Sequence, residues 1–480
     1  MSIAAAIPDQ APVPVGANEE LAGPPRIDPL YATRPVEPSE RISSVDIIRG
    51  FSLMGILIMN ITDFAYGFAN YAVPLSTAKP VFNGPHWKIN TAAWFLRWIL
   101  AEGKMRALFS MLFGAGVVLL TARAESRGAG VRAADIYTRR NMWLVLFGML
   151  HCYLIWNGDI LYFYGVAALL FLFPFRNLKP KKLLWTAGVI LLINTLVVQF
   201  GQTFAAVHTM KQAEKANIAL AHHQVLTEDQ ISDLKSWQSM QDRWRMPAKK
   251  IYKDIAAHQN GWLSQGADAK DALMGELKGA YFGFGDWVGL MLLGMALYRL
   301  GFFSLKCSTR TYVLTAIIGL GIAWPLTFWG CWHAWRSHFD MFSTAFALNY
   351  PYDLTRVSGA LGNAAVLLLL ARFGIFKWLL ARVAAVGQMA LSNYILTSLA
   401  MKTIFVWGSW HWYGYVEYYK IYYAVAAMWV VNLAFSTIWL RYFRFGPLEW
   451  CWRSLTYWKR QPMKLAAPQH LPVETAPVAA

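Results

Sequence analysis

Four ionisable side chains are the first candidates for acid–base chemistry: His86, His151, Asp63 and Asp159. His151 lies inside an apolar run, Asp159 follows it in the turn N-G-D, and His86 lies in the sequence G-P-H-W. Histidine titrates near neutral pH and can carry a proton, and a carboxylate can orient it as a general base. The pattern indicates either a catalytic site or, for His151, a buried structural donor with a satisfied hydrogen bond.

A second group of polar residues marks the two ends of the first apolar run. Asp46 and Arg49 are three residues apart, so they share one face of a helix. Arg49 can hold a phosphate or carboxylate group, or it can pair with Asp46 and extend toward water as an anchor. Asn60 and Asp63 share a face at the other end, where they form a cap, an interhelical bond or one half of an acid–base site.

Positive charge also occurs at the start of the second long apolar run, in the sequence E-G-K-M-R that contains Glu102, Lys104 and Arg106. The positive-inside rule does not account for cations at this end of a span. They either neutralise the carboxylates of Glu102, Asp63 and Asp159 or bind an anionic group. Two further polar residues in apolar surroundings complete the set of candidate binding residues: Asp286 and Asn393.

The composition decides which elements must position these residues. The chain has 480 residues, of which 56% are hydrophobic and only 15% are charged, and its mean hydropathy is +0.33. Soluble domains carry roughly 25% charged residues. The sequence therefore predicts an all-α, polytopic transmembrane helical bundle. The net charge of +17 fits basic loops that meet anionic lipid, and we expect no nucleic-acid partner.

Apolar runs recur at the length of about 20 residues that a membrane span requires. Residues 91–103 are expected to form a tilted extension before the second span. The sequence predicts ten spans, at 45–67, 104–122, 141–157, 159–175, 183–205, 281–302, 311–331, 356–373, 383–407 and 421–440.

Lys and Arg concentrate in alternate loops, which predicts that both termini lie in the cytoplasm. The insertion at 206–280 mixes both charge signs and has apolar residues at helical spacing, so it is expected to form a helical extracytoplasmic unit. That unit either shields a substrate entrance or is a variable decoration. The expected divisions are a tail at 1–40, spans one to five at 41–205, the insertion at 206–280, spans six to ten at 281–460 and a tail at 461–480.

Several long motifs resemble one known family. They are R-I-S-S-V-D-I-I-R-G (41–50) with G-I-L-I-M-N-I (55–61), E-G-K-M-R-A-L-F-S-M-L-F-G-A-G (102–116), R-R-N-M-W-L-V-L-F-G-M-L-H (139–151) with G-D-I-L (158–161), and F-G-P-L-E-W-C-W-R-S-L-T-Y (445–457). In this order they resemble the YeiB-type membrane family, a bacterial domain of unknown function numbered four-one-eight. That family is distantly similar to transmembrane acyltransferases such as heparan-alpha-glucosaminide N-acetyltransferase. The similarity lies in the first helix, at Val45-Asp46, Arg49-Gly50 and Asn60.

The resemblance implies that the protein lies in the bacterial inner membrane, with membrane lipid as a partner. It also implies transfer of an acyl group from cytoplasmic acyl-CoA to an envelope glycan or lipid acceptor outside. In the acetyltransferase a histidine in the loop between the first helices takes part, and the corresponding loop here contains His86. The alternatives are a transporter for a small anionic metabolite, in which His151 and Asn393 line the path and Asp159 gates it, and a non-catalytic membrane scaffold. No bound cofactor and no metal site are expected, since the sequence has no H-E-x-x-H or phosphate-loop motif. The oligomeric state stays open.

Overall fold

Helices account for the regular structure that a computed structural model gives this chain. The structure describes residues 43–126, 132–259, 274 and 284–465. Within these ranges the backbone is helical apart from turns, loops and one isolated antiparallel bridge between Phe443 and Lys464. The expected all-α class is confirmed. The expected tail at 1–40 lies outside the described residues, as does all of the expected tail at 461–480 beyond residue 465.

The first half of the chain begins with an apolar helix of 24 residues and returns through two further long helices. Its helices are α2 (Ser43–Tyr66), α3 (Trp87–Leu100), α4 (Lys104–Ser126), α5 (Arg132–Leu154), α6 (Leu161–Ala167), α7 (Phe173–Phe175), α8 (Pro180–Asn194), α9 (Gly201–Ala221), α10 (Glu228–Trp244) and α11 (Ala248–His258). Three residues separate α3 from α4, in line with the expected extension before the second span. A reciprocal capping box between Thr227 and Gln230 begins α10.

The second half starts with helical residues 284–299 and contains a long helix interrupted only by Pro325. Its named helices are α13 (Thr309–Arg336), α14 (Met341–Thr344), α15 (Tyr352–Phe373), α16 (Lys377–Gln388), α17 (Ala390–Lys402), α18 (Ile421–Tyr442) and α19 (Pro447–Tyr457). Side-chain caps fix two helix starts: Ser308 accepts from the Thr311 backbone N–H and Asp340 from that of Ser343.

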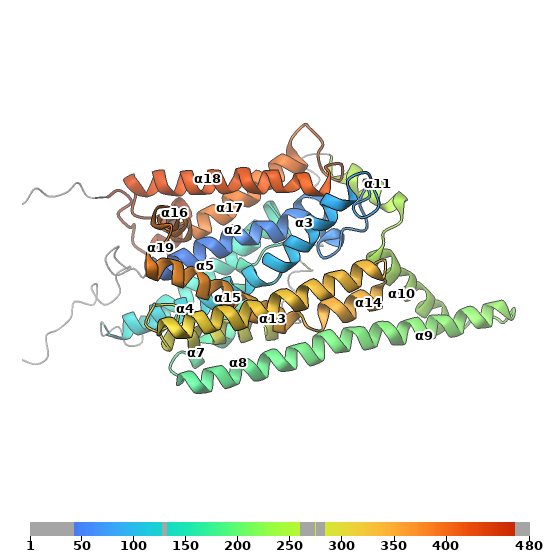
Figure 1. The fold of residues 1–480 in the computed structure, drawn as a ribbon, viewed down its shortest axis with the longest axis horizontal. Coiled ribbons are helices and arrows are strands. Elements are labelled where there is room, and N and C mark those ends of the chain that lie inside the picture. Colours follow the sequence, from blue (N-terminus) through green and yellow to red (C-terminus); the bar gives the residue numbers. More distant parts are fainter. Residues whose placement is uncertain (1–42, 127–131, 260–273, 275–283, 466–480) are drawn as a thin grey trace, which may run out of the picture.

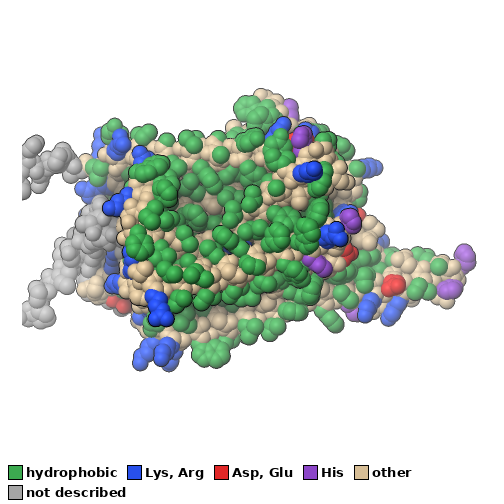
Figure 2. All heavy atoms as spheres, in the orientation of Figure 1, with side chains coloured by type: hydrophobic (Ala, Val, Ile, Leu, Met, Phe, Trp, Pro, Cys, Tyr) green, Lys and Arg blue, Asp and Glu red, His purple; other side chains and the backbone are tan. Residues whose placement is uncertain are grey.

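Six helical runs within the described residues are long and apolar enough to cross a membrane, or seven if one bent pair is counted as a span. The chain is therefore a helical membrane protein. The count of ten spans and the cytoplasmic position of the termini stay predictions. Figure 2 shows a broad apolar belt on this face between two polar ends, of which the left end is rich in Lys and Arg and the right end mixes both signs with His.

One expected span is not a continuous helix. The region 383–407 was predicted as a single helix, but α16 and α17 meet at Met389 with a bend of 85°. The apolar composition continues through the bend, so hydropathy alone did not reveal it. The prediction of an unbroken span here is wrong, and the bend places the start of α17 inside the bundle.

The helix that begins at Pro180 continues through a π-helical segment to Ala221, a run of 42 residues. At 1.5 Å per residue it is about 63 Å long, twice the thickness of a bilayer core. Figure 1 shows α9 extending past the other helices, with α10 returning beside it toward α11. The boundary expected at residue 206 falls within this run, and the described part of the insertion is helical.

Glycines allow the central helices to approach closely. A Cβ on Gly50 of α2 would lie 1.9 Å from the Val383 carbonyl oxygen, and one on Gly387 of α16 would lie 2.0 Å from the Asp46 carbonyl oxygen. Gly114 of α4 faces the Met291 backbone in the same way. Small residues at such crossings are typical of membrane helix packing.

We expect Gly387→Ala to lower the free energy of unfolding by about 1–3 kcal/mol, because the added methyl group must separate two backbones. Thermal unfolding of the detergent-solubilised protein would measure this as a lower Tm. Gly188→Ala is the matched control, since a Cβ on Gly188 of α8 has no atom within 4 Å. Equal Tm values for the two variants would show that the crossing of α2 and α16 is not tightly packed.

Candidate functional site

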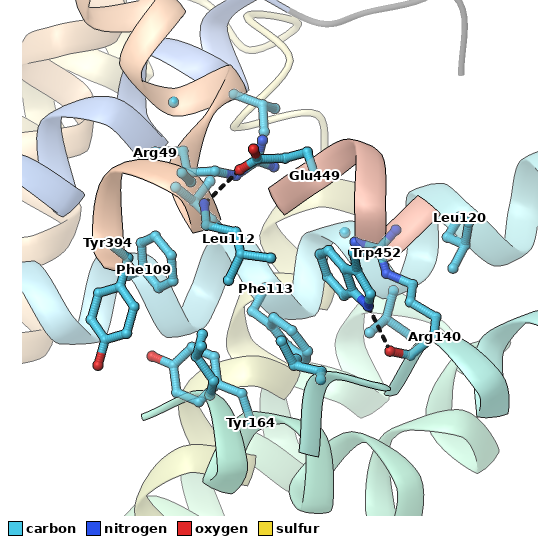
Figure 3. Close-up of a pocket in the computed structure, with 18 of the residues that line it drawn as sticks. Arg49, Phe109, Leu112, Phe113, Leu120, Arg140, Tyr164, Tyr394, Glu449 and Trp452 are labelled. Atoms are coloured by element: carbon cyan, nitrogen blue, oxygen red, sulfur yellow. Dashed lines mark hydrogen bonds between the residues drawn. The ribbon is translucent and has the colours of Figure 1, made fainter. Parts of the chain in front are cut away.

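A cavity of about 240 Å³ lies in the bundle between α2, α4, α5, α6, the bend between α16 and α17, and α19. Most of its wall is apolar. Its charged lining residues are Asp46, Arg49, Arg123, Arg140, Glu449 and Arg453. Figure 3 shows Arg140 and Trp452 on one side of this space and Tyr394, Phe109 and Tyr164 on the other.

Four arginines and two carboxylates give the lining an excess of positive charge. Arg49 Nη1 donates to Asp46 Oδ1 at 2.8 Å, so the pair expected from their spacing is present while both residues also face the cavity. The Arg140 guanidinium lies 4.1 Å from the ring centre of Trp452, whose indole N–H donates to the Arg140 carbonyl oxygen at 2.8 Å. Arginine in this arrangement suits an anionic group such as a phosphate.

The bend between α16 and α17 is held by Glu449 of α19. Its Oε1 accepts from the backbone N–H groups of Leu391 and Ser392 at 2.6 and 3.1 Å, and its Oε2 accepts from the Ser392 hydroxyl at 2.5 Å. Burial raises the pKa of the Glu449 carboxyl, and the hydrogen bonds from Ser392 oppose that rise. Glu449 therefore caps α17. Because these hydrogen bonds occupy its carboxylate, Glu449 offsets the positive charge of the arginines only in part.

Aromatic rings line the middle of the cavity, and a glycine leaves free space in its wall. Phe113 and Phe109 of α4 pack around Tyr164, with ring centres 5.1 and 6.1 Å from that of Tyr164. The Tyr164 hydroxyl is 2.6 Å from the Ser110 hydroxyl. A Cβ on Gly116 would have no atom within 4 Å, so this glycine opens space in the lining where a larger side chain would fill it.

The structure brings together one of the expected histidine–carboxylate pairs. His151 Nδ1 lies 2.7 Å from Asp159 Oδ1, and both side chains are buried. Asp159 Oδ2 accepts from the Tyr162 backbone N–H at 2.7 Å, which fixes the carboxylate. An ionised carboxylate accepts only, so the imidazole hydrogen lies on Nδ1. His151 Nε2 is then an acceptor, and it has no hydrogen-bond partner within the described part of the chain.

The His151–Asp159 pair adjoins the cavity through two residues. The Tyr394 ring centre lies 5.0 Å from that of His151, and Tyr394 lines the cavity. Ile160, the residue after Asp159, lines it too. Neither His151 nor Asp159 lines the cavity itself, so Tyr394 and Ile160 stand between the pair and the cavity.

Asp63 bonds to an indole, and it has no hydrogen bond to a histidine within the described part of the chain. Its Oδ2 accepts from the Trp156 indole N–H at 2.7 Å, and the Trp156 ring centre lies 6.1 Å from that of His151. The expected role of Asp63 in orienting a histidine is replaced by this contact. Asn60 is half-buried one turn earlier on α2.

His86 is placed apart from these residues. Its side chain is 49% exposed, its Nδ1 lies 3.7 Å from Glu417 Oε2, and its ring centre lies 5.7 Å from that of Tyr419. The carboxylate beside His86 is therefore Glu417, and not Asp63 or Asp159 as expected. The two candidate histidines have different surroundings, one buried and oriented, one at the surface.

Lys104 and Arg106 pair differently from the expectation. Arg106 Nη1 donates to Asp286 Oδ2 at 2.5 Å, and Lys104 Nζ donates to the Trp98 carbonyl oxygen at 2.9 Å. Neither is paired with Asp63 or Asp159. Two buried arginines that the sequence analysis did not select complete the network: Arg356, which pairs with Asp286 and Asp353, and Arg97, which pairs with Glu102.

Asn393 has a structural position. Its Nδ2 donates to the Ser436 hydroxyl at 2.8 Å and to the Val386 carbonyl oxygen at 3.2 Å. It thus joins α17 to α18 across the bend. The sequence pattern does not single out Arg140, Arg453 or Tyr394, which line the cavity, because basic residues are common in loops and an aromatic residue in a span usually serves packing.

Comparisons with known proteins agree with the motifs. Residues 297–459 match the family described as "Protein of unknown function (DUF418)". The chain is 29% identical to the uncharacterized protein YeiB of Escherichia coli (strain K12) over 421 residues, 87% of this chain and 96% of that protein. It is also 29% identical to the uncharacterized protein YxaH of Bacillus subtilis (strain 168) over 450 residues, 90% of this chain and 98% of that protein. The chain is therefore similar to YeiB and YxaH over most of its length, and its second part matches the DUF418 model.

No solved structure matches this chain. The matched DUF418 segment supplies Tyr394, Glu449 and Arg453 to the cavity, whereas His151 and Asp159 come from the part before it. The resemblance of the first helix to membrane acyltransferases stays a prediction.

We expect Asp286→Asn to lower the free energy of unfolding by about 3–5 kcal/mol, because it removes the carboxylate partner of Arg106 and leaves Arg356 with Asp353 alone. Thermal unfolding in detergent would measure the loss. Asp135→Asn is the control: Asp135 pairs with Arg139 at 2.6 Å on an exposed helix face, and its loss should cost no more than about 0.5 kcal/mol. Similar Tm shifts for both variants would contradict a stabilising role for the buried network.

Proposed function

We propose that this protein is a multi-pass acyltransferase of the bacterial cytoplasmic membrane. It would move an acyl group from cytoplasmic acyl-CoA to an extracytoplasmic glycan or lipid acceptor. The observation that carries the proposal is the buried His151–Asp159 pair, whose Nε2 has no partner among the described residues and which adjoins a cavity with an excess of arginine.

Acyl-CoA has the chemistry that this cavity suits. Its phosphate groups are anionic, and Arg49, Arg123, Arg140 and Arg453 are the side chains that would hold them. Its extended arm and acyl chain would lie along the aromatic wall around Tyr164. A donor bound in this way brings its thioester toward Tyr394 and the imidazole beyond it.

The proposed transfer step needs only His151 and Asp159 from the protein to move the proton. The acceptor hydroxyl or amine would give its proton to His151 Nε2 while its oxygen or nitrogen attacks the thioester carbonyl carbon. The carbon–sulfur bond breaks, and the imidazolium returns the proton to the leaving thiolate, which gives free CoA and an acylated acceptor. Asp159 would stabilise the imidazolium and keep the hydrogen on Nδ1.

One observation favours a second function, transport of a small anion. A bent helix pair inside a bundle, with its break at a cavity, is typical of transporters, and the α16–α17 bend at Met389 has this form. Counterflow of a labelled anion in liposomes, unaffected by His151→Gln, would support transport and contradict acyl transfer.

We expect His151→Gln to reduce acyl transfer by about 10²–10⁴-fold, because glutamine cannot accept and return the proton. The measurement uses purified protein in nanodiscs, radiolabelled acetyl-CoA and an envelope extract. His86→Gln is the matched control and should retain transfer, since His86 lies at the surface beside Glu417. Full activity of His151→Gln, or equal loss in both variants at unchanged Tm, would contradict the assignment of the base.

The donor cavity has its own test in the same assay. We expect Gly116→Leu to raise the KM for acetyl-CoA at least tenfold, because the side chain fills the cavity without a clash at its Cβ. Gly188→Leu makes the same change on the exposed side of α8 and should leave the KM unchanged. An unaltered KM in Gly116→Leu would place the donor elsewhere.

A further inference from the structure

A second, smaller pocket lies at the opposite end of α2 from the Arg49 mouth. It has a volume of about 60 Å³ and is lined by the loop after α2, by α11 of the insertion and by Tyr413 and Gly414. Figure 1 shows α11 at this end of the bundle, beside the ends of α2 and α3. The space is enough for one or two hydroxyl groups or waters, so it takes an edge of a ligand and not a whole one.

Two polar side chains of this pocket, Asp254 and Tyr413, contact each other, and His258 packs behind Tyr413. The Tyr413 hydroxyl donates to Asp254 Oδ2 at 2.9 Å, and the His258 ring stacks on Tyr413 with ring centres 4.2 Å apart. His258 Nδ1 lies 2.8 Å from the Asp254 carbonyl oxygen, which can only accept. The hydrogen is therefore on Nδ1, and Nε2 is an acceptor. Asp254 is 39% exposed and keeps a face toward the outside.

One exposed aromatic ring lines the pocket, and others lie on the elements that form it. Phe68 lines it and is 76% exposed, and Tyr252 lies on α11. The loop that supplies Tyr413 and Gly414 presents three more large exposed rings, Trp410, Trp412 and Tyr415. Rings beside hydrogen-bonding carboxylate and imidazole groups match a sugar, which has apolar C–H faces and a hydroxyl edge.

The backbone is shaped to keep this pocket open. Gly67 and Gly414 both have a positive φ, 79° and 78°. A Cβ on Gly67 would lie 2.6 Å from the Tyr413 hydroxyl, and one on Gly414 would lie 2.5 Å from Ile255. Only glycine fits at these two positions.

The pocket lies close to the proposed reaction centre. Asp63 is within electrostatic range of Asp254, His258 and Lys402. Beneath it, Trp156 bonds to Asp63 and packs on Phe64 with ring centres 4.4 Å apart. This aromatic layer separates the pocket from His151.

We propose that the pocket under α11 is a sugar-binding site for the acceptor. Asp254 and His258 accept hydrogen bonds from ring hydroxyl groups, and the aromatic rim packs against the sugar face. Its role as an acceptor site rests on the proposed acyltransferase function, but sugar binding is measurable without any transfer. The alternative is that these aromatic rings only mark the membrane boundary. In that case the pocket would not bind sugar, and the test must distinguish the two.

Binding is tested on the full chain in nanodiscs by saturation-transfer NMR with methyl β-glucoside and methyl β-N-acetylglucosaminide as probes. We expect at least one probe to bind with a millimolar Kd, unchanged in His151→Gln. Asp254→Asn and Phe68→Ala should each weaken binding about tenfold, which corresponds to 1.4 kcal/mol. A Kd of about 50 millimolar is the weakest affinity that such a site would have. If neither probe binds at that concentration, the proposal is overturned.

Three controls separate ligand contact from structural support. Asp242→Asn removes a carboxylate of the same insertion that bonds to Lys250 away from the pocket, and Phe204→Ala removes an exposed ring on α9. Both should bind the probes as the natural chain does. Tyr413→Phe frees Asp254 from its tyrosine partner and should keep or strengthen binding. Loss of binding in Tyr413→Phe equal to that in Asp254→Asn would show that Asp254 only anchors α11, and would overturn the proposal.

Discussion

A charged side chain inside a membrane bundle is tolerated only when a partner or water compensates its charge, and this constraint organises the molecule. Asp286 lies between Arg106 and Arg356, Glu102 pairs with Arg97, and Asp159 pairs with His151. Each pair joins helices that are distant in the sequence or fixes a turn between neighbours. Around the cavity four arginines outnumber two carboxylates, although Arg49 bonds to Asp46 and Arg140 packs on Trp452. An anionic ligand would complete the balance there.

The sequence revealed the helical class, the main apolar runs and several polar residues of the bundle. The pair at Asp46 and Arg49 followed from helical spacing, which is a local property. The bend at Met389 did not, because both sides of it are equally apolar and the cause, Glu449, lies 60 positions later. The sequence also could not predict which charged residues pair, because partners such as Asp286 and Arg106 are 180 residues apart.

Two openings at opposite ends of the bundle meet a common aromatic layer. The arginine cavity ends near Tyr394 and Ile160, and the small outer pocket ends near Gly67. Phe64 and Trp156 pack on each other, and Trp156 contacts both Asp63 and His151. In the proposed reaction, donor and acceptor would come from different sides, and the layer would keep water and ions from crossing while either site is empty. Trp156 is held in place by Asp63, so an acceptor hydroxyl that bonded to Asp63 would compete with the indole.

The long run from Pro180 to Ala221 and the returning α10 form a hairpin that projects beyond the bundle. The tip of the hairpin contacts few parts of the membrane domain, whereas its base is attached there by hydrogen bonds. The Trp244 indole N–H donates to the Phe339 carbonyl oxygen at 2.9 Å, and the Met246 backbone N–H donates to the Ser76 hydroxyl at 2.8 Å. Matched additions or deletions of whole helical turns in both arms would change the reach of the hairpin by about 5.4 Å per turn and leave the fastened base in register. The length of this arm can therefore vary while the contacts at its base stay the same.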